Sequence, residues 1–133
     1  MFTKLKFKSH YEDPYGSVEI KTYDLLPVFF ISAKGIINPH LVKKVLKEAE
    51  EFAKDHPKGW RYIVDTSKVR WGNPRNMLLM RKIKKLPNIK EYLVVAPSPI
   101  IRFGEGLTKK WLKVNQVFKN EDELMSYLRP ELA

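Results

Sequence analysis

The sequence predicts an α/β domain whose sheet is mixed but mainly parallel, with four to five strands, an N-terminal hairpin and about four helices. After the hairpin, short β-type runs alternate with amphipathic helical segments, which is the order of βαβ units. The chain has 133 residues, 44% of them hydrophobic and 30% charged, which suits one core. No linker-like segment divides it, so we expect a single domain over residues 1–133.

The N-terminal part of the chain predicts strands. Residues 1–16 begin with apolar residues between lysines, a pattern typical of an edge strand, or else form an N-terminal extension. Asp13–Gly16 has the composition of a turn. The runs Val18–Tyr23 and Val28–Ala33 predict an antiparallel hairpin, and Gly35 is expected to end its second strand.

A polar residue followed by proline is expected to open three helices, because the side chain caps free N–H groups and proline needs none at the first helical position. The pairs are Asn38-Pro39, Asn73-Pro74 and Ser98-Pro99. Buried strands are predicted at Trp60–Val64 and Glu91–Ala96, and a further strand at Lys113–Phe118. Asn120 with Glu123 has capping-box spacing and predicts a last helix, with Leu124, Tyr127 and Leu128 facing inward.

Composition excludes several classes of function. With no cysteine, the chain has no disulfide, thiolate nucleophile or cysteine zinc site, which fits a cytoplasmic address. The N-terminus lacks the apolar core of a signal peptide, and no apolar run is long enough to span a bilayer. The net charge of +10 would attract polyanions, although the lysines are spread over nearly every segment, which favours a solubilising surface.

The segment Tyr62–Trp71, YIVDTSKVRW, joins an apolar strand to the pattern Asp-x-Ser-x-Val-x-aromatic. It resembles the STAS domain of anti-sigma-factor antagonists, in particular the SpoIIAA-like (STAS/SEC14-type) group, over about residues 17–130 in element order. The resemblance implies a STAS/SpoIIAA-like fold and a regulatory, non-enzymatic interaction module. Members that switch sigma factors carry a phosphorylated serine where this chain has Gly72–Asn76, GNPRN, so the resemblance implies that the usual switch is absent.

Ligands of open α/β sheets gather beyond the carboxyl ends of the strands, so we expect a protein partner or small ligand to bind there. The candidate residues are Asp65, Thr66, Ser67, Trp71, Asn73, Arg75, Ser98 and Phe103. The alternative is that the short polar side chains among them only bond locally and cap loops or helices.

Two other binding functions stay open. An apolar ligand such as a lipid would need a pocket at the third helix, bordered by Phe103, Leu107 and Trp111. Nucleic acid would need a basic patch, for which the candidates are Arg81, Lys82, Lys84, Lys85, Lys109 and Lys110. The alternative for this patch is a solvated helix face.

An enzyme is the least supported class. No nucleophile, acid–base pair or hydrolase motif can be assembled, and the three histidines lack metal-ligand spacing. We expect no metal and no cofactor. The identity of the partner and the oligomeric state, with a homodimer among the options, are left open.

Overall fold

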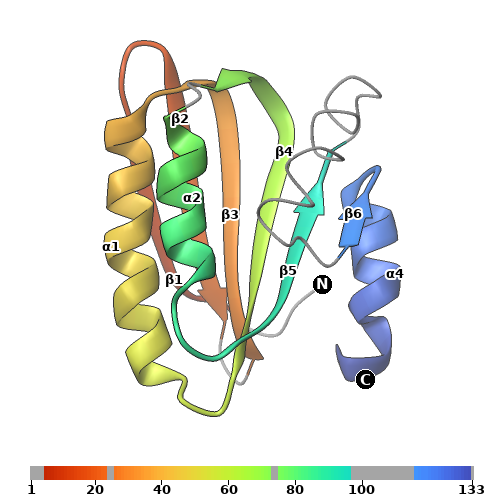
Figure 1. Ribbon diagram of the computed structural model, residues 1–133. Coiled ribbons are helices and arrows are strands. Elements are labelled where there is room, and N and C mark those ends of the chain that lie inside the picture. Colours follow the sequence, from red (N-terminus) through yellow and green to blue (C-terminus); the bar gives the residue numbers. More distant parts are fainter. Residues whose placement is uncertain (1–4, 24–25, 73–74, 97–115, 133) are drawn as a thin grey trace.

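The computed structural model describes residues 5–23, 26–72, 75–96 and 116–132, which form a six-stranded sheet with helices on both faces (Figure 1). The strands are β1 (Leu5–Glu12), β2 (Gly16–Tyr23), β3 (Leu26–Ile37), β4 (Trp60–Gly72), β5 (Ile89–Val95) and β6 (Gln116–Phe118). They lie in sequence order across the sheet. β1, β2 and β3 pair antiparallel, whereas β3, β4, β5 and β6 pair parallel. The predicted mixed, mainly parallel sheet and its hairpin are confirmed, with β1 as an edge strand.

Three helices lie within the described ranges: α1 (Pro39–Asp55), α2 (Asn76–Lys84) and α4 (Glu121–Leu132). α1 and α2 lie side by side on one face of the sheet, and α4 covers the other (Figure 1). The first core layer joins α1 and α2 to residues such as Phe29 and Tyr62. The second joins Leu124 and Leu128 of α4 to alternate residues such as Ile63. The helix expected from Ser98-Pro99 lies outside the described residues.

β3 and β4 are longer than the sequence indicates. The predictions that one strand stops at Val64 and that Gly35 ends the other are wrong, because β4 continues to Gly72 and its second half pairs with the second half of β3. In that pairing Gly35 lies opposite Val69. The polar residues remain extended here because they pair with the second half of β3.

The helix starts differ in detail from the predictions. Pro39 occupies the start of α1, but the Asn38 side chain makes no cap bond and instead donates to Asp13 Oδ2 at 3.1 Å. It therefore ties the β1–β2 turn to α1. Asn73-Pro74 is not among the described residues, and α2 begins at Asn76 after Arg75.

The last helix has the predicted polar start. The Asn120 side-chain oxygen accepts the Glu123 N–H at 2.9 Å, and Glu123 Oε2 accepts the Lys119 N–H at 2.9 Å. Leu124 and Leu128 are buried as predicted. Tyr127 is not, because 41% of it is exposed.

None of the helices described here is long and apolar enough to cross a membrane.

Candidate functional site

The Asp-Thr-Ser segment lies inside β4, at the level where β5 ends. Asp65 pairs with Val95, the last residue of β5, and Thr66 Oγ1 donates to the Val95 carbonyl oxygen at 2.5 Å. Asp65 is buried, with a fractional exposure of 7%, and its Oδ1 accepts the Ser67 N–H at 2.8 Å. The pairing with β3 also shifts register after Ser32, which is typical of a β-bulge.

Beside this segment lies a hollow of about 650 Å³, which we call the polar hollow. Asp65 and Ser67 line it from β4, and Lys119, Asn120 and Glu121 line it at the start of α4. The remaining lining residues come from the three N-terminal strands and from Lys68: His10, Glu12, Ser17, Glu19, Lys21, Ser32, Ala33, Lys34 and Lys68. The hollow thus mixes acidic and basic side chains on the α4 face of the sheet.

A carboxyl pair lies at one edge of the polar hollow. The pKa of Glu121 is raised above its ordinary value, chiefly by a hydrogen bond with Asp65, then by burial and by the charge of Asp65. The ammonium groups of Lys21 and Lys68 act in the opposite direction. Asp65 and Glu121 therefore lie close together in the lining of the polar hollow, which the sequence did not indicate.

The second candidate surface is the outer face of α2, which we define as Arg75, Leu78, Arg81, Lys82 and Lys85. Its residues are three or four positions apart, so they share one side of the helix. All five are exposed, and Leu78 is 62% exposed in the middle of the four basic residues. Lys84, by contrast, is partly buried.

A buried amide fixes the start of α2. Asn76 is 7% exposed, and its Nδ2 donates to the carbonyl oxygen of Ile37, at the end of β3, at 2.9 Å. On the opposite side of the helix, Leu79 and Ile83 are buried in the core. Leu78 consequently has to face outward.

The predicted site residues divide between two places. Asp65, Thr66 and Ser67 lie together in β4, with Asp65 and Ser67 on the α4 face. Arg75, Arg81, Lys82, Lys84 and Lys85 lie in or next to α2, which packs on the other face. The backbone of Trp71 pairs with Ile36 in the β3–β4 ladder. The candidates Asn73, Ser98, Phe103, Lys109 and Lys110 lie outside the described residues, as does the expected lipid pocket at the third helix.

Sequence reasoning missed Leu78, Asn76 and Glu121. Leu79 and Ile83 are four positions apart, and helical spacing that turns both of them inward turns Leu78 toward solvent. In the part of the chain that the structure describes, no group of histidine and acidic side chains is arranged to hold a metal ion.

No protein-family model matches the chain, and no curated protein matches its sequence. Solved structures do match its fold. An anti-sigma factor antagonist from Mycobacterium paratuberculosis superposes with a TM-score of 0.64 at 18% identity, over 90% of this chain and 99% of that one. The anti-sigma factor antagonist SpoIIAA in its unphosphorylated form gives a TM-score of 0.61 at 13% identity, over 84% of this chain and 97% of that one. The chain therefore has the STAS-like fold of the anti-sigma factor antagonists, as the resemblance in Tyr62–Trp71 predicted.

Proposed function

We propose that the chain is a non-enzymatic regulatory module that binds a protein partner through the outer face of α2. The observation that carries the proposal is Leu78, a large apolar side chain that is 62% exposed between basic residues on a short, well-anchored helix. The two similar structures are anti-sigma factor antagonists, so their fold serves protein recognition, which supports the same class of function here.

The chemistry of this face defines the partner. An exposed leucine supplies an apolar anchor, and burying it on binding is favourable by roughly 1.5–3 kcal/mol. Arg75, Arg81, Lys82 and Lys85 around it favour acidic residues on the other side and would speed association. The partner we propose therefore has a small apolar pocket with carboxylates at its rim.

Anchoring of α2 also supports this use. The buried Asn76 amide and the packed Leu79 and Ile83 hold the helix against the sheet. A rigid surface loses little conformational entropy when it binds.

Recovery of partners from a lysate tests the proposal. Tagged protein is compared with the variants Leu78→Asp and Arg75→Glu, and with Lys58→Glu, a charge-matched change at the exposed α1–β4 turn. We expect a discrete protein that the unmodified chain and Lys58→Glu recover equally, and that both α2 variants recover at least ~10-fold less. Equal recovery by all four proteins would refute a specific α2 surface.

Nucleic-acid binding through the same basic side chains is the second candidate. Lys43, Lys47 and Lys54 are exposed on α1, which packs beside α2 and adds further basic side chains. Binding of this kind would weaken steeply with salt and would be nearly indifferent to Leu78→Asp. Retention on single-stranded RNA that survives Leu78→Asp and is lost on Lys82→Glu/Lys85→Glu would favour it over a protein partner.

A further inference from the structure

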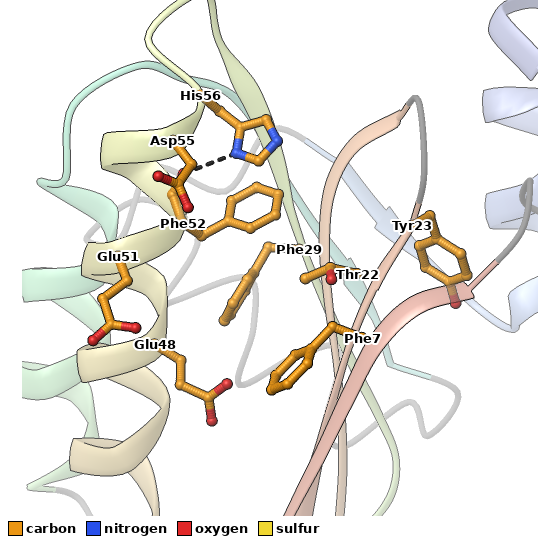
Figure 2. Close-up of a pocket in the computed structure, with 9 residues that line it drawn as sticks. All are labelled: Phe7, Thr22, Tyr23, Phe29, Glu48, Glu51, Phe52, Asp55 and His56. Atoms are coloured by element: carbon orange, nitrogen blue, oxygen red, sulfur yellow. Dashed lines mark hydrogen bonds between the residues drawn. The ribbon is translucent and has the colours of Figure 1, made fainter.

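A separate pocket of about 320 Å³ lies between the C-terminal half of α1 and the outer strands of the sheet (Figure 2). Nine residues line it: Phe7, Thr22, Tyr23, Phe29, Glu48, Glu51, Phe52, Asp55 and His56. It is on the α1 face of the sheet, away from both the polar hollow and the start of α2. None of its lining residues belongs to the sites described above.

The pocket has an aromatic floor. Phe29 is buried, and its ring centroid lies 5.3 Å from that of Phe52. Phe7 lies across the opening and is 52% exposed, although it is on a strand otherwise rich in lysine (Figure 2). The His56 ring stacks on Phe52 at 3.9 Å, held by its Nδ1–H, which donates to the Phe52 carbonyl oxygen at 2.9 Å. An apolar group can therefore enter between aromatic rings.

One wall of the pocket is acidic. Glu48, Glu51 and Asp55 are three or four positions apart on α1, so they are neighbours on the helix surface, and all three line the pocket. Among the described residues that line the pocket there is no lysine or arginine, in a chain whose net charge is +10. This concentration of negative charge is thus local and lies beside the aromatic floor.

The hydrogen-bond donors near these carboxylates satisfy only part of their hydrogen-bonding capacity. Ser9 Oγ lies 2.8 Å from both carboxylate oxygens of Glu48 and donates to this group. The Lys44 ammonium lies 4.9 Å above the Tyr11 ring, outside the lining. Thr22 is 7% exposed and lines the pocket, and among the described residues its hydroxyl makes no hydrogen bond. A buried hydroxyl that opens into a cavity points to a polar group of a ligand.

We propose that this pocket binds a small organic cation, an ammonium group carried on an aromatic body. The body packs between Phe7, Phe29 and Phe52, and the ammonium donates hydrogen bonds to Glu51 and Asp55. The Thr22 hydroxyl oxygen accepts a further hydrogen bond. Charge-assisted hydrogen bonds and a cation near ring faces both favour such a ligand over a neutral one.

The size of the pocket limits the ligand. At about 320 Å³ it lies at the lower end of the ~300–1,000 Å³ typical of small-molecule pockets. One ring with a short amine fits this volume. The acidic wall repels anions, so a carboxylate of the same shape is excluded.

Titration of the full chain with three probes of matched shape tests the proposal: 2-phenylethylammonium, neutral 2-phenylethanol and anionic 3-phenylpropionate. Binding is followed by ¹H–¹⁵N NMR. We expect saturable shifts at Thr22, Phe52 and His56 with the ammonium, and at least ~10-fold weaker binding of the other two, which is the factor expected from about 1.4 kcal/mol of charge-assisted contact.

Variants on α1 provide the control. Glu51→Gln/Asp55→Asn should weaken ammonium binding about 10-fold or more, because both charged acceptors are lost. Glu50→Gln, an exposed change on the same helix outside the pocket lining, should leave the affinity unchanged. Equal affinity for all three probes, equal loss with Glu50→Gln, or no saturation below ~10 mM would overturn the proposal. None of these results bears on the outer face of α2, which lies on another surface.

Discussion

The rings of Tyr62 in β4 and Tyr92 in β5 stack with their centroids 4.7 Å apart and their planes at 26°. They are register partners in two parallel strands, and both are almost fully buried. Burial also raises the pKa of the Tyr62 hydroxyl. Because the rings oppose each other only in this register, the pair helps fix the alignment that brings Asp65 next to Val95.

Removing the Tyr62 ring should strongly destabilise the fold. Tyr62→Ala is expected to lower the free energy of unfolding by ~3–5 kcal/mol, because a large buried ring leaves a cavity. Urea denaturation measures the change. Tyr15→Ala, at a position 65% exposed, should alter the same quantity by less than ~0.5 kcal/mol. If the two variants were equally stable, the stacked pair would not be part of the core.

Gly35 lies where two strands approach closely. Its φ is 81°, and a Cβ there would lie 2.6 Å from the carbonyl oxygen of Tyr15. Gly35→Ala should therefore cost ~1–3 kcal/mol of unfolding free energy in a thermal or urea melt. Gly35→Asn tests the cause, because asparagine tolerates a positive φ but still carries a Cβ. We expect it to be as destabilising as alanine, whereas recovery of stability would mean that φ alone matters.

Asp13 joins the β1–β2 turn to the start of α1. Its carboxylate accepts the Tyr15 and Gly16 N–H groups at 2.8 and 2.9 Å, and lies 3.0 Å from His40 Nε2. The pKa of Asp13 is lowered, first by the hydrogen bond from Asn38. A lowered pKa gives stability that is present above the ordinary value of 3.8 and lost as the pH falls through the lowered one.

The test is a comparison of Asp13→Asn with the unmodified chain at several pH values. The unmodified chain should be the more stable at pH 7, and the difference should shrink between about pH 5 and 3 as the carboxylate is protonated. Thermal melts measure this difference in stability at each pH. A difference that stays constant with pH would show that the charge of Asp13 contributes nothing.

For Glu121 we expect the opposite dependence of folding stability on pH. Its pKa is raised above 4.5 by Asp65, so the protonated form is favoured in the folded state. That contribution is present at low pH and is lost as the pH rises through the raised value. Glu121→Gln should thus gain stability relative to the unmodified chain between pH 4 and 7, by ~0.5 kcal/mol or less, because Glu121 is largely exposed.

Asp122→Asn supplies the control for Glu121, since Asp122 is also exposed but does not line the polar hollow. Its stability relative to the unmodified chain should change less with pH than that of Glu121→Gln. If both variants followed the same curve, the effect would come from net charge and not from the contact with Asp65.

Much of the fold could be predicted because apolar patterning reports burial directly. The runs around Ile63 and Leu93 are buried on both faces of the sheet, so they stand out as continuous apolar strands. The alternation in Val18–Tyr23 and the apolar stripe of α1 were equally clear. These patterns were sufficient to predict a mixed, mainly parallel sheet with an N-terminal hairpin.

The second half of β4 could not be predicted in this way. Asp65, Thr66 and Ser67 have side chains that favour turns, and only the pairing with β3 keeps them extended. Asn38 has the chemistry of a helix cap, but Asp13 on the other strand competes for its side chain. In both cases a contact distant in sequence decides the local structure.

The acidic pocket beside α1 could not be predicted from the sequence either. Glu48 and Glu51 have lysines four residues earlier, which predicts ordinary surface ion pairs on α1. Only the tertiary structure brings Phe7 and Ser9 of β1 opposite these carboxylates. The exposure of Leu78, by contrast, could be predicted from helical spacing, because Leu78 is next in sequence to Leu79, which faces inward.

Photo-cross-linking tests the central claim, that the chain binds a protein partner through the outer face of α2, most directly. A photoreactive phenylalanine is placed at Leu78, and in a second protein at Tyr127, which is 41% exposed on α4 across the sheet. The account predicts one discrete protein cross-linked from position 78 in cells and none, or far less, from position 127. Equal cross-linking from both positions, or none from position 78, would contradict it.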